Sequence, residues 1–425
     1  MTNDVRAVSG AVDEQRLRAD LEANGDIGRV DVEADDGWGR TVLCGTEPNR
    51  RARERFVERL READLDVWVD AVGNVVGRWT PAGADPEAAP VAAGSHLDSV
   101  PAGGIFDGPL GAYAALEAVR AMQDTGVAPE RPVEVVCFTE EEGQRFADGL
   151  LGSSVAAGRR SVDEALALEA DDGTTLEAAL EAVDFRGDGR LDAGEWHAWV
   201  ELHIEQDTTL EAEAATVGVV TTITGITHCE VAIDGEADHA GATGMNERTD
   251  ALAAASELVL DVEAAAEDVV ASSSETAVGT VGSLDVTPNA TNVVPGRVEL
   301  GVDVRDVEYD SMETIVEATR ASLDLLERDR GVDTAFERPF DLRPTPMSDR
   351  LRTAAHDAAA VADLDAIDVH SGAAHDTMHV ADVTDAALLF APSVDGISHN
   401  PAEWTEWDDC ADATRVLAGA LLRAD

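Results

Sequence analysis

The sequence lacks lysine altogether, so its 31 cationic residues are all arginines, set against 86 aspartates and glutamates. The formal net charge is therefore −55 at pH 7. This balance excludes the basic surface patch that nucleic-acid-binding proteins use. The acidic residues are spread along the whole chain, which argues against a single acidic interaction tail. We interpret the distribution as adaptation to molar salt. At 1 M salt the screening length is about 3 Å, so repulsion between carboxylates further apart than this is largely removed.

Long apolar runs and paired cysteines are also missing. No segment approaches the roughly 20 apolar residues that a membrane-spanning helix needs. The N-terminal segment MTNDVRAVSGAVDEQRLRAD has no apolar stretch of the kind found in secretory signals. The four cysteines are far apart and form no CxxC pair, which argues against a disulfide framework and a zinc ribbon. We therefore expect a cytoplasmic protein with reduced cysteines and no membrane or nucleic-acid partner.

The pattern of apolar segments indicates two domains, as expected for a chain of 425 residues. Residues 1–213 and 333–425 alternate apolar strands with helices, which predicts an α/β fold with a mostly parallel sheet. Residues 214–332 are rich in strands and contain two predicted helices, at 248–265 and 311–328. We predict a catalytic domain formed by the two outer segments and an inserted α+β domain of ferredoxin-like type.

Several histidines and carboxylates follow the apolar strands directly. His96 ends VAAGSH, Asp107 lies in the glycine-rich loop PAGGIFDG, His203 ends WVELH, and His399 follows ALLFAPS. Ligand-binding groups of open α/β sheets gather at the carboxyl ends of the strands, so we expect these side chains to lie close together. Imidazole and carboxylate without thiolate suit zinc, or manganese, cobalt or nickel.

Three consecutive glutamates, Glu140, Glu141 and Glu142, follow the apolar strand VEVVCF. Adjacent carboxylates at the end of a buried strand are costly to desolvate unless cations compensate their charge. A solvated acidic turn is the alternative in so acidic a chain, but the hydrophobic strand before it argues against that. With a bridging carboxylate, such residues can hold two ions roughly 3.5–4 Å apart. A further carboxylate then takes the proton of the attacking water.

Across residues 91–403 the chain resembles the M20 metallopeptidase family, and within it the hydantoinase/carbamoylase branch of amidases. The matching motifs are GSHLDSVPAGGIFDGPLGA, FTEEEGQRF, LLGS, LHIEQ, GEADHAGATGMNERTDAL, PNATNVVPG, DVRD, SGAAHD and PSVDGISHNPAE. The resemblance implies two divalent metal ions, with zinc favoured over manganese, cobalt or nickel. It also implies a homodimer, formed through an inserted domain that serves as a lid.

The resemblance further assigns roles to single residues. The implied metal ligands are His96, Asp107, Glu142, His203 and His399. Asp107 would bridge the two ions, and which ion takes which of the last two histidines stays open. Glu141 matches the general base, Glu140 would support it, and Asp98 matches the carboxylate that orients His96.

Other implied residues would contact the substrate. His239 matches a histidine that polarises the scissile carbonyl, in related enzymes from the partner subunit. Gln206, Asn292 and Arg305 match substrate-binding positions. Arg305 taken alone would be an ordinary surface ion pair, but its place in DVRD favours binding of a substrate carboxylate. Two residues of SGAAHD, the histidine and the aspartate, are left open as structural or supporting.

Residues 184–195, DFRGDGRLDAGE, follow the spacing of an EF-hand calcium loop. Arg186 occupies a position that normally carries an acid, and no paired helices flank the segment. In so acidic a chain, a coincidental match is favoured over a calcium site.

The resemblance implies hydrolysis of the N-carbamoyl group of N-carbamoyl-L-amino acids, or of the ureido group of an analogue such as allantoate. An M20 aminopeptidase or aminoacylase is the alternative within the family. An inactive homologue that serves as a binding protein is the alternative from another class, and the complete set of ligands and base argues against it.

We predict that the protein unfolds when it is moved from molar salt into dilute buffer. Unscreened repulsion among its carboxylates would then destabilise the compact state. Circular dichroism melts in molar potassium chloride and in dilute buffer measure this effect. An unchanged melting temperature without added salt would contradict the interpretation.

Overall fold

The computed structural model describes residues 2–31, 37–127, 129–147 and 149–424, and it divides into two compact units. The large unit comprises Met1–Thr221 and Met347–Asp425, and the inserted unit comprises Thr222–Pro346. The sequence interpretation placed the insert at residues 214–332, so both limits lie further along the chain. Strand β6 (Val217–Ile223) pairs with β15 (Ala386–Ala391) of the large unit, which moves the first limit. Strand β12 (Asp333–Leu342) pairs with β7 (Gly225–Asp234) of the inserted unit, which moves the second.

The large unit is built on a nine-stranded sheet of order β1-β2-β4-β3-β5-β15-β6-β13, with β14 paired to β6. Its remaining strands are β1 (Asp66–Val69), β2 (Val75–Trp79), β3 (Val91–His96), β4 (Val133–Phe138), β5 (Ala198–Ile204), β13 (Thr345–Pro346), β14 (Ala366–Ser371) and β15 (Ala386–Ala391). The four central strands β4, β3, β5 and β15 run parallel and are buried along their whole length. This confirms the predicted α/β class, because strands buried on both faces are typical of parallel sheets.

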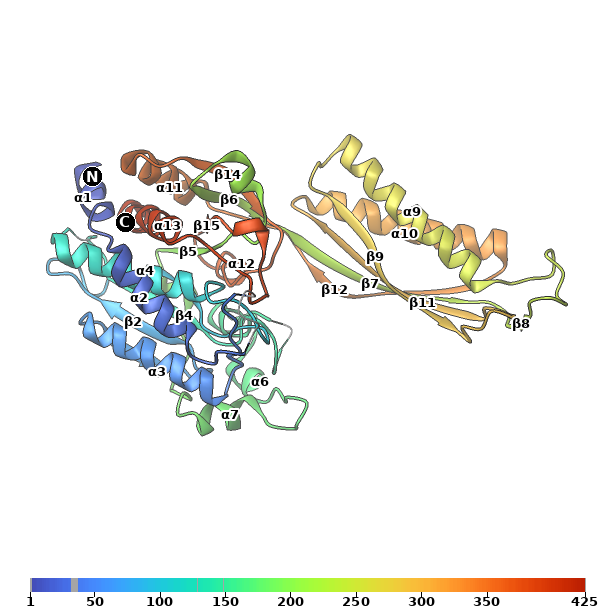
Figure 1. Cartoon of the computed structure of the whole chain (residues 1–425), viewed down its shortest axis with the longest axis horizontal. Helices are drawn as coiled ribbons and strands as arrows, with labels where there is room; N and C mark the ends of the chain where they lie inside the picture. Colours follow the sequence, from blue (N-terminus) through green and yellow to red (C-terminus); the bar gives the residue numbers. More distant parts are fainter. Residues whose placement is uncertain (1, 32–36, 128, 148, 425) are drawn as a thin grey trace. The chain divides into compact units, whose positions relative to one another are not determined.

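Helices cover this sheet and form the main hydrophobic core with it (Figure 1). They are α1 (Thr2–Ser9), α2 (Glu14–Gly25), α3 (Glu47–Glu62), α4 (Pro109–Thr125), α5 (Leu151–Ala156), α6 (Val162–Leu166), α7 (Leu176–Ala182), α8 (Thr209–Glu213), α11 (Asp349–Ala362), α12 (Thr377–Val380) and α13 (Trp407–Ala424). Helix α4 lies very close to β5, since a Cβ added at Gly111 would be 2.1 Å from the carbonyl oxygen of Leu202. None of the helices in the described part of the chain is long and apolar enough to cross a membrane.

The register of the parallel strands brings the chemically important segments to one edge of the sheet. His96, the last residue of β3, pairs with Phe138, the last residue of β4. His203 in β5 pairs with Phe390 near the end of β15. The loops that follow these strands carry Asp107, the three glutamates and His399, so one edge collects all of them.

The inserted unit is a separate α+β fold with its own core. Its four-stranded antiparallel sheet has the order β12-β7-β11-β9, and α9 and α10 pack against it. The elements are β7 (Gly225–Asp234), α9 (Ala251–Ser272), β9 (Val278–Thr287), β11 (Arg297–Asp306) and α10 (Tyr309–Arg330), followed by β12. This βαββαβ order is ferredoxin-like, as predicted. A small ribbon joins β8 (Asp238–His239) to β10 (Val293–Val294).

Helix α9 begins three residues later than the sequence predicts. Asp250 has an extended backbone, and its side chain accepts hydrogen bonds from the backbone N–H groups of Leu252 and Ala253. An aspartate in this arrangement is a favoured N-cap, which satisfies amides at the start of a helix. The helix therefore begins at Ala251.

Candidate metal centre

Asp107 is shared by two groups of side chains, and each group could hold a metal ion. The first group is His96, Asp107 and His203, and the second is Asp107, Glu142 and His399. The Nε2 atom of His203 is 3.3 Å from Oδ1 of Asp107, whereas Nε2 of His399 is 3.4 Å from Oδ2. Oε2 of Glu142 is also 3.4 Å from Nε2 of His399. The two carboxylate oxygens of Asp107 therefore face different groups, which is the arrangement that a bridging ligand requires.

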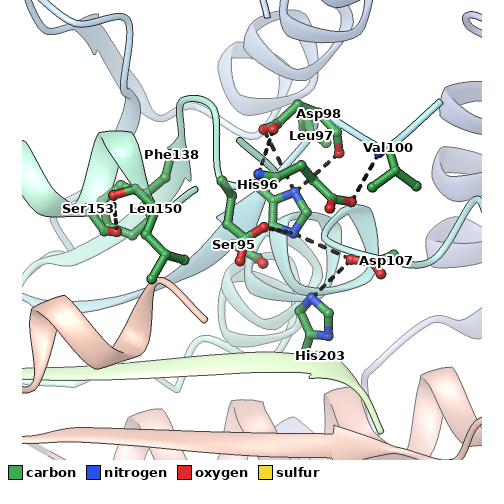
Figure 2. Close-up of polar contacts among 12 residues, drawn as sticks. Ser95, His96, Leu97, Asp98, Val100, Asp107, Phe138, Leu150, Ser153 and His203 are labelled. Atoms are coloured by element: carbon green, nitrogen blue, oxygen red, sulfur yellow. Dashed lines mark hydrogen bonds and ion pairs between the residues drawn. The ribbon is translucent and has the colours of Figure 1, made fainter. Parts of the chain in front are cut away.

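The two buried histidines both present Nε2 to Asp107 (Figure 2). Nδ1 of His96 is 3.2 Å from the carbonyl oxygen of Asp98, and Nδ1 of His203 is 3.1 Å from that of Ile204. A carbonyl oxygen only accepts, so each Nδ1 carries a proton, and Nε2 is the nitrogen available to a metal ion. In the described structure, Nε2 of His96 is buried and has no hydrogen-bond partner. Both rings are thus oriented with Nε2 toward the place where a metal ion would lie.

Asp98 contacts His96 through both its main-chain oxygen and its carboxylate. Its main-chain oxygen lies closer to Nδ1 of His96 than its carboxylate does, at 3.2 Å against 3.8 Å. The carboxylate oxygen Oδ2 instead accepts a hydrogen bond from the backbone N–H of Glu142, at 3.1 Å. Asp98 therefore orients His96 with its backbone and the Glu142 loop with its side chain.

The centre concentrates buried negative charge. Burial raises the pKa of Glu141 well above its ordinary value, and the nearby carboxylate of Asp376 adds to the effect. Burial and the charge of Asp107 raise the pKa of Glu142 in the same way. Burial opposes protonation of His96, yet Glu141 and the neighbouring aspartates raise its pKa well above the usual range. These carboxylates need positive charge near them. Without a metal ion, bound protons must supply it, and divalent cations would take their place.

The three consecutive glutamates have separate surroundings. Glu140 has a positive φ of 54°, uncommon outside glycine, and its Oε1 accepts from the backbone N–H groups of Arg145 and Phe146. Oε2 of Glu141 is 3.6 Å from Nε2 of His96. Oε1 of Glu142 accepts from the backbone N–H of Val100 at 3.2 Å. Glu140 therefore shapes the loop, while Glu141 and Glu142 face the centre.

Gln206 was predicted to bind substrate, and its side chain contacts the centre itself. Its Nε2 donates to Oδ2 of Asp107 at 2.8 Å and lies 3.0 Å from Oγ of Ser398. Its backbone has a φ of 60° and its N–H donates to Oγ of Ser393. Gln206 thus holds the central carboxylate on the side of the His399 loop.

A buried network beneath the histidine ligands includes Glu201, which sequence reasoning missed, and His375, whose role it left open. The carboxylate of Glu201 accepts from Oγ of Ser95 at 2.7 Å and from Oγ1 of Thr377 at 2.6 Å, which ties β5 to β3 and α12. The ring of His375 packs 4.6 Å from that of His203, and burial lowers its pKa well below normal. The position of Glu201, two residues before His203 on the same strand face, was the available signal.

The remaining substrate-binding candidates lie in the inserted unit, at opposite ends of its sheet. His239 pairs with Val293, and the N–H of Ala240 donates to the carbonyl oxygen of Asn292, so His239 and Asn292 are neighbours. Arg305 lies on β11 opposite Ile226, and its Nε is 2.9 Å from Oδ1 of Asp303. The β8–β10 ribbon adjoins the Arg297 end of β11. Arg297 and Arg305 are eight residues apart on this strand, which is about 26 Å at the usual rise per residue.

The segment 184–195 belongs to the large unit and packs against it. Leu191 is buried and donates its N–H to Oδ2 of Asp70, while Asp192 pairs with Arg190. The short 3-10 helix Ala193–Glu195 and then β5 follow, so no second EF-hand helix is present. Its acidic side chains belong to neither potential metal group found among the described residues.

Known proteins match the chain over most of its length. The sequence pattern of peptidase family M20/M25/M40 matches residues 92–423. An N-carbamoyl-L-amino acid amidohydrolase from Geobacillus stearothermophilus is 38% identical, over 95% of this chain and 96% of its own. An allantoate amidohydrolase from Bacillus subtilis is 32% identical, over 91% and 92%. A crystal structure of a hydantoinase/carbamoylase family amidase from Burkholderia multivorans matches with a TM-score of 0.89 at 37% identity, over 97% and 98%.

We predict that the chain binds two divalent ions and that His203→Ala and His399→Ala each remove one of them. Each histidine belongs to only one of the two groups that share Asp107. Elemental analysis after dialysis against zinc or manganese in molar salt counts the ions. His356→Ala is the matched control, because that exposed histidine pairs with Asp368 outside both groups. Retention of both ions by His399→Ala would contradict the assignment.

Proposed function

This chain belongs to peptidase family M20/M25/M40, and from that premise we propose that it is a two-metal amidohydrolase of carbamoyl and ureido compounds. Its substrates would be N-carbamoyl-L-amino acids or close analogues such as allantoate. The bond cleaved is a carbon–nitrogen bond of a linear amide. The observation that carries the proposal is Asp107, whose two oxygens face separate groups of imidazole and carboxylate ligands. The amidohydrolases that match nearly the whole chain support the choice of substrate class.

The donor set fits two divalent ions. It contains imidazole nitrogen and carboxylate oxygen without thiolate, which suits zinc first and manganese, cobalt or nickel as alternatives. Such ions, when bound, polarise a substrate carbonyl and lower the pKa of a water molecule. His96, Asp107 and His203 would hold one ion, and Asp107, Glu142 and His399 the other.

Glu141 would act as the general base. It lies beside the ligand His96 without belonging to either group of ligands, so its carboxylate is free to take a proton from the attacking water. The same carboxyl would then return the proton to the leaving nitrogen. Burial raises the pKa of Glu141, which makes its carboxylate a stronger base in the first step and lets the carboxyl keep the proton until the leaving nitrogen takes it.

Residues of the inserted unit would bind the substrate. The guanidinium of Arg305 would exchange Asp303 for the substrate carboxylate, which it can bind through two parallel hydrogen bonds. His239 and Asn292 would donate hydrogen bonds to the oxygen that becomes negative as the carbonyl is attacked. Gln206 would add a contact from the large unit when its amide turns from Asp107.

We also propose a cytoplasmic homodimer in which His239 and Asn292 serve the active site of the partner subunit. The length of β11 supports this, because the Arg297 end, which the ribbon of His239 adjoins, lies about 26 Å from Arg305 at the usual strand rise. A single substrate of amino-acid size does not span that distance. Light scattering in molar salt measures the mass in solution, and a mass of one chain would contradict the dimer.

A substrate panel tests the proposed reaction. We expect turnover of N-carbamoyl-L-amino acids or allantoate in molar salt with added zinc, manganese or cobalt. The D-enantiomers of the carbamoyl compounds are the matched controls, because they present the same groups in the opposite hand. Faster hydrolysis of dipeptides or N-acetyl amino acids would favour the aminopeptidase or aminoacylase alternative. No turnover of any compound would favour an inactive binding protein.

The variant Glu141→Gln tests the base. We expect turnover to fall by about a hundred- to ten-thousand-fold, the usual contribution of a positioned acid–base group. The metal content should stay at two ions, since Glu141 is not among the ligands. Glu134→Gln is the control, because that buried carboxylate on β4 contacts Arg78 and Trp196 instead of the centre. If Glu141→Gln keeps its turnover, another group is the base.

A further inference from the structure

Glu403 is a buried carboxylate that joins the two loops on either side of the centre. It lies four residues after His399 and is 1% exposed. Its Oε1 accepts hydrogen bonds from the backbone N–H groups of Phe106 at 3.0 Å and Asp107 at 3.1 Å. Its Oε2 is 3.2 Å from Oγ of Ser398, the residue before His399. One side chain therefore connects the backbone of the bridging residue with the loop of a ligand almost 300 positions away.

The surroundings of Glu403 leave it little freedom to move. A Cβ added at Gly104 would lie 2.1 Å from the carboxyl carbon of Glu403, so only glycine fits there. The N–H of Glu403 donates to the carbonyl oxygen of Asn400, and the N–H of Trp38 donates to that of Pro401 at 2.7 Å. The carboxylate is thus fixed from both sides, by the Asp107 loop and by its own turn.

The loop of His399 has few other attachments to the centre. The His399 side chain is 54% exposed, whereas those of His96 and His203 are almost fully buried. Its backbone has a φ of 54°, a left-handed conformation that costs free energy outside glycine and persists only where the surroundings impose it. Ser398 beside it contacts Oδ2 of Asp107 at 2.8 Å. The contacts of Ser398 and Glu403, together with those of Gln206, therefore connect the loop of this exposed ligand to Asp107.

We propose that Glu403 is a positioning residue that sets Asp107 and His399 at the spacing the second metal ion requires. The inference rests on the proposed two-metal function. It does not make Glu403 a ligand, because its oxygens are occupied by the N–H groups of Phe106 and Asp107 and by Ser398. Loss of Glu403 would loosen the second group, Asp107, Glu142 and His399, more than the first, whose histidines are anchored on β3 and β5.

Three substitutions separate geometry from charge. Glu403→Ala removes all three contacts. Glu403→Gln keeps a carbonyl oxygen for the two N–H groups and turns its NH₂ toward Ser398, so it preserves the geometry without the charge. Glu403→Asp keeps the charge but is one methylene shorter, and it no longer reaches both loops. Glu117→Ala is the matched control, since Glu117 is an equally buried carboxylate that pairs with Arg16.

Binding of zinc to the folded protein is measured by competition with a chromophoric chelator in molar salt. We expect Glu403→Ala and Glu403→Asp to lower the affinity for the second ion by about 10- to 100-fold, as for other residues that support metal ligands. The first ion should bind as in the wild type, and Glu403→Gln should keep both. Glu117→Ala should lower the melting temperature without changing either affinity.

The outcomes distinguish this inference from the proposed function. Failure of the wild type to bind two ions would overturn the two-metal function itself. Two ions bound normally by the wild type and equally well by Glu403→Ala and Glu403→Asp would overturn only the role of Glu403. Loss of the second ion in Glu403→Gln but not in Glu403→Asp would also overturn the positioning role. The negative charge of residue 403 would then matter for binding, and the length of its side chain would not.

Discussion

The site depends on how one buried carboxylate, that of Asp107, is held between segments that are distant in sequence. Asp107 lies outside any strand or helix, in the loop between β3 and α4. Its position is set by Glu403 through the backbone and by Gln206 and Ser398 through the side chain. The histidines come to it from the ends of β3 and β5, two parallel strands in direct register. The sheet thus supplies a rigid half of the centre, and the loops supply the other half.

The different anchoring of the two halves has an energetic reason. Strand-borne His96 and His203 are fixed by backbone pairing that the whole core stabilises, and Glu201 and His375 pack beneath them. Glu142 and His399 lie on loops, where no strand pairing fixes the backbone and hydrogen bonds must set the geometry. Each such bond contributes only about 0.5–1.5 kcal/mol net. Several are therefore needed, and the loops carry them at Val100, Asp98, Ser398 and Glu403.

Much of this arrangement was predictable from the sequence, and what was missed has a common cause. Apolar runs and motif spacing are visible in the sequence, and they identify the ligand candidates at or after the strand ends: His96, Asp107, Glu142, His203 and His399. Glu201 and Glu403 do not, because their partners lie 106 and 297 positions away and no local pattern encodes such a pairing. The limits of the insert were misplaced for a similar reason. Strands β6 and β12 have unremarkable sequences, and only their pairing partners decide to which unit they belong.

The charge of the chain bears on the chemistry as well as on the fold. An N-carbamoyl amino acid carries a carboxylate, so a surface with a net charge of −55 repels it in dilute solution. Molar salt confines that repulsion to about 3 Å, and the substrate then reaches the protein with little penalty. Once it is inside the site, screening by bulk salt weakens and a local cation must hold it. The proposed role of Arg305 agrees with this, because in a chain without lysine only an arginine side chain can supply a fixed positive charge there. In the proposed function, salt would thus govern the approach of the substrate, and the guanidinium and the two metal ions would govern its binding.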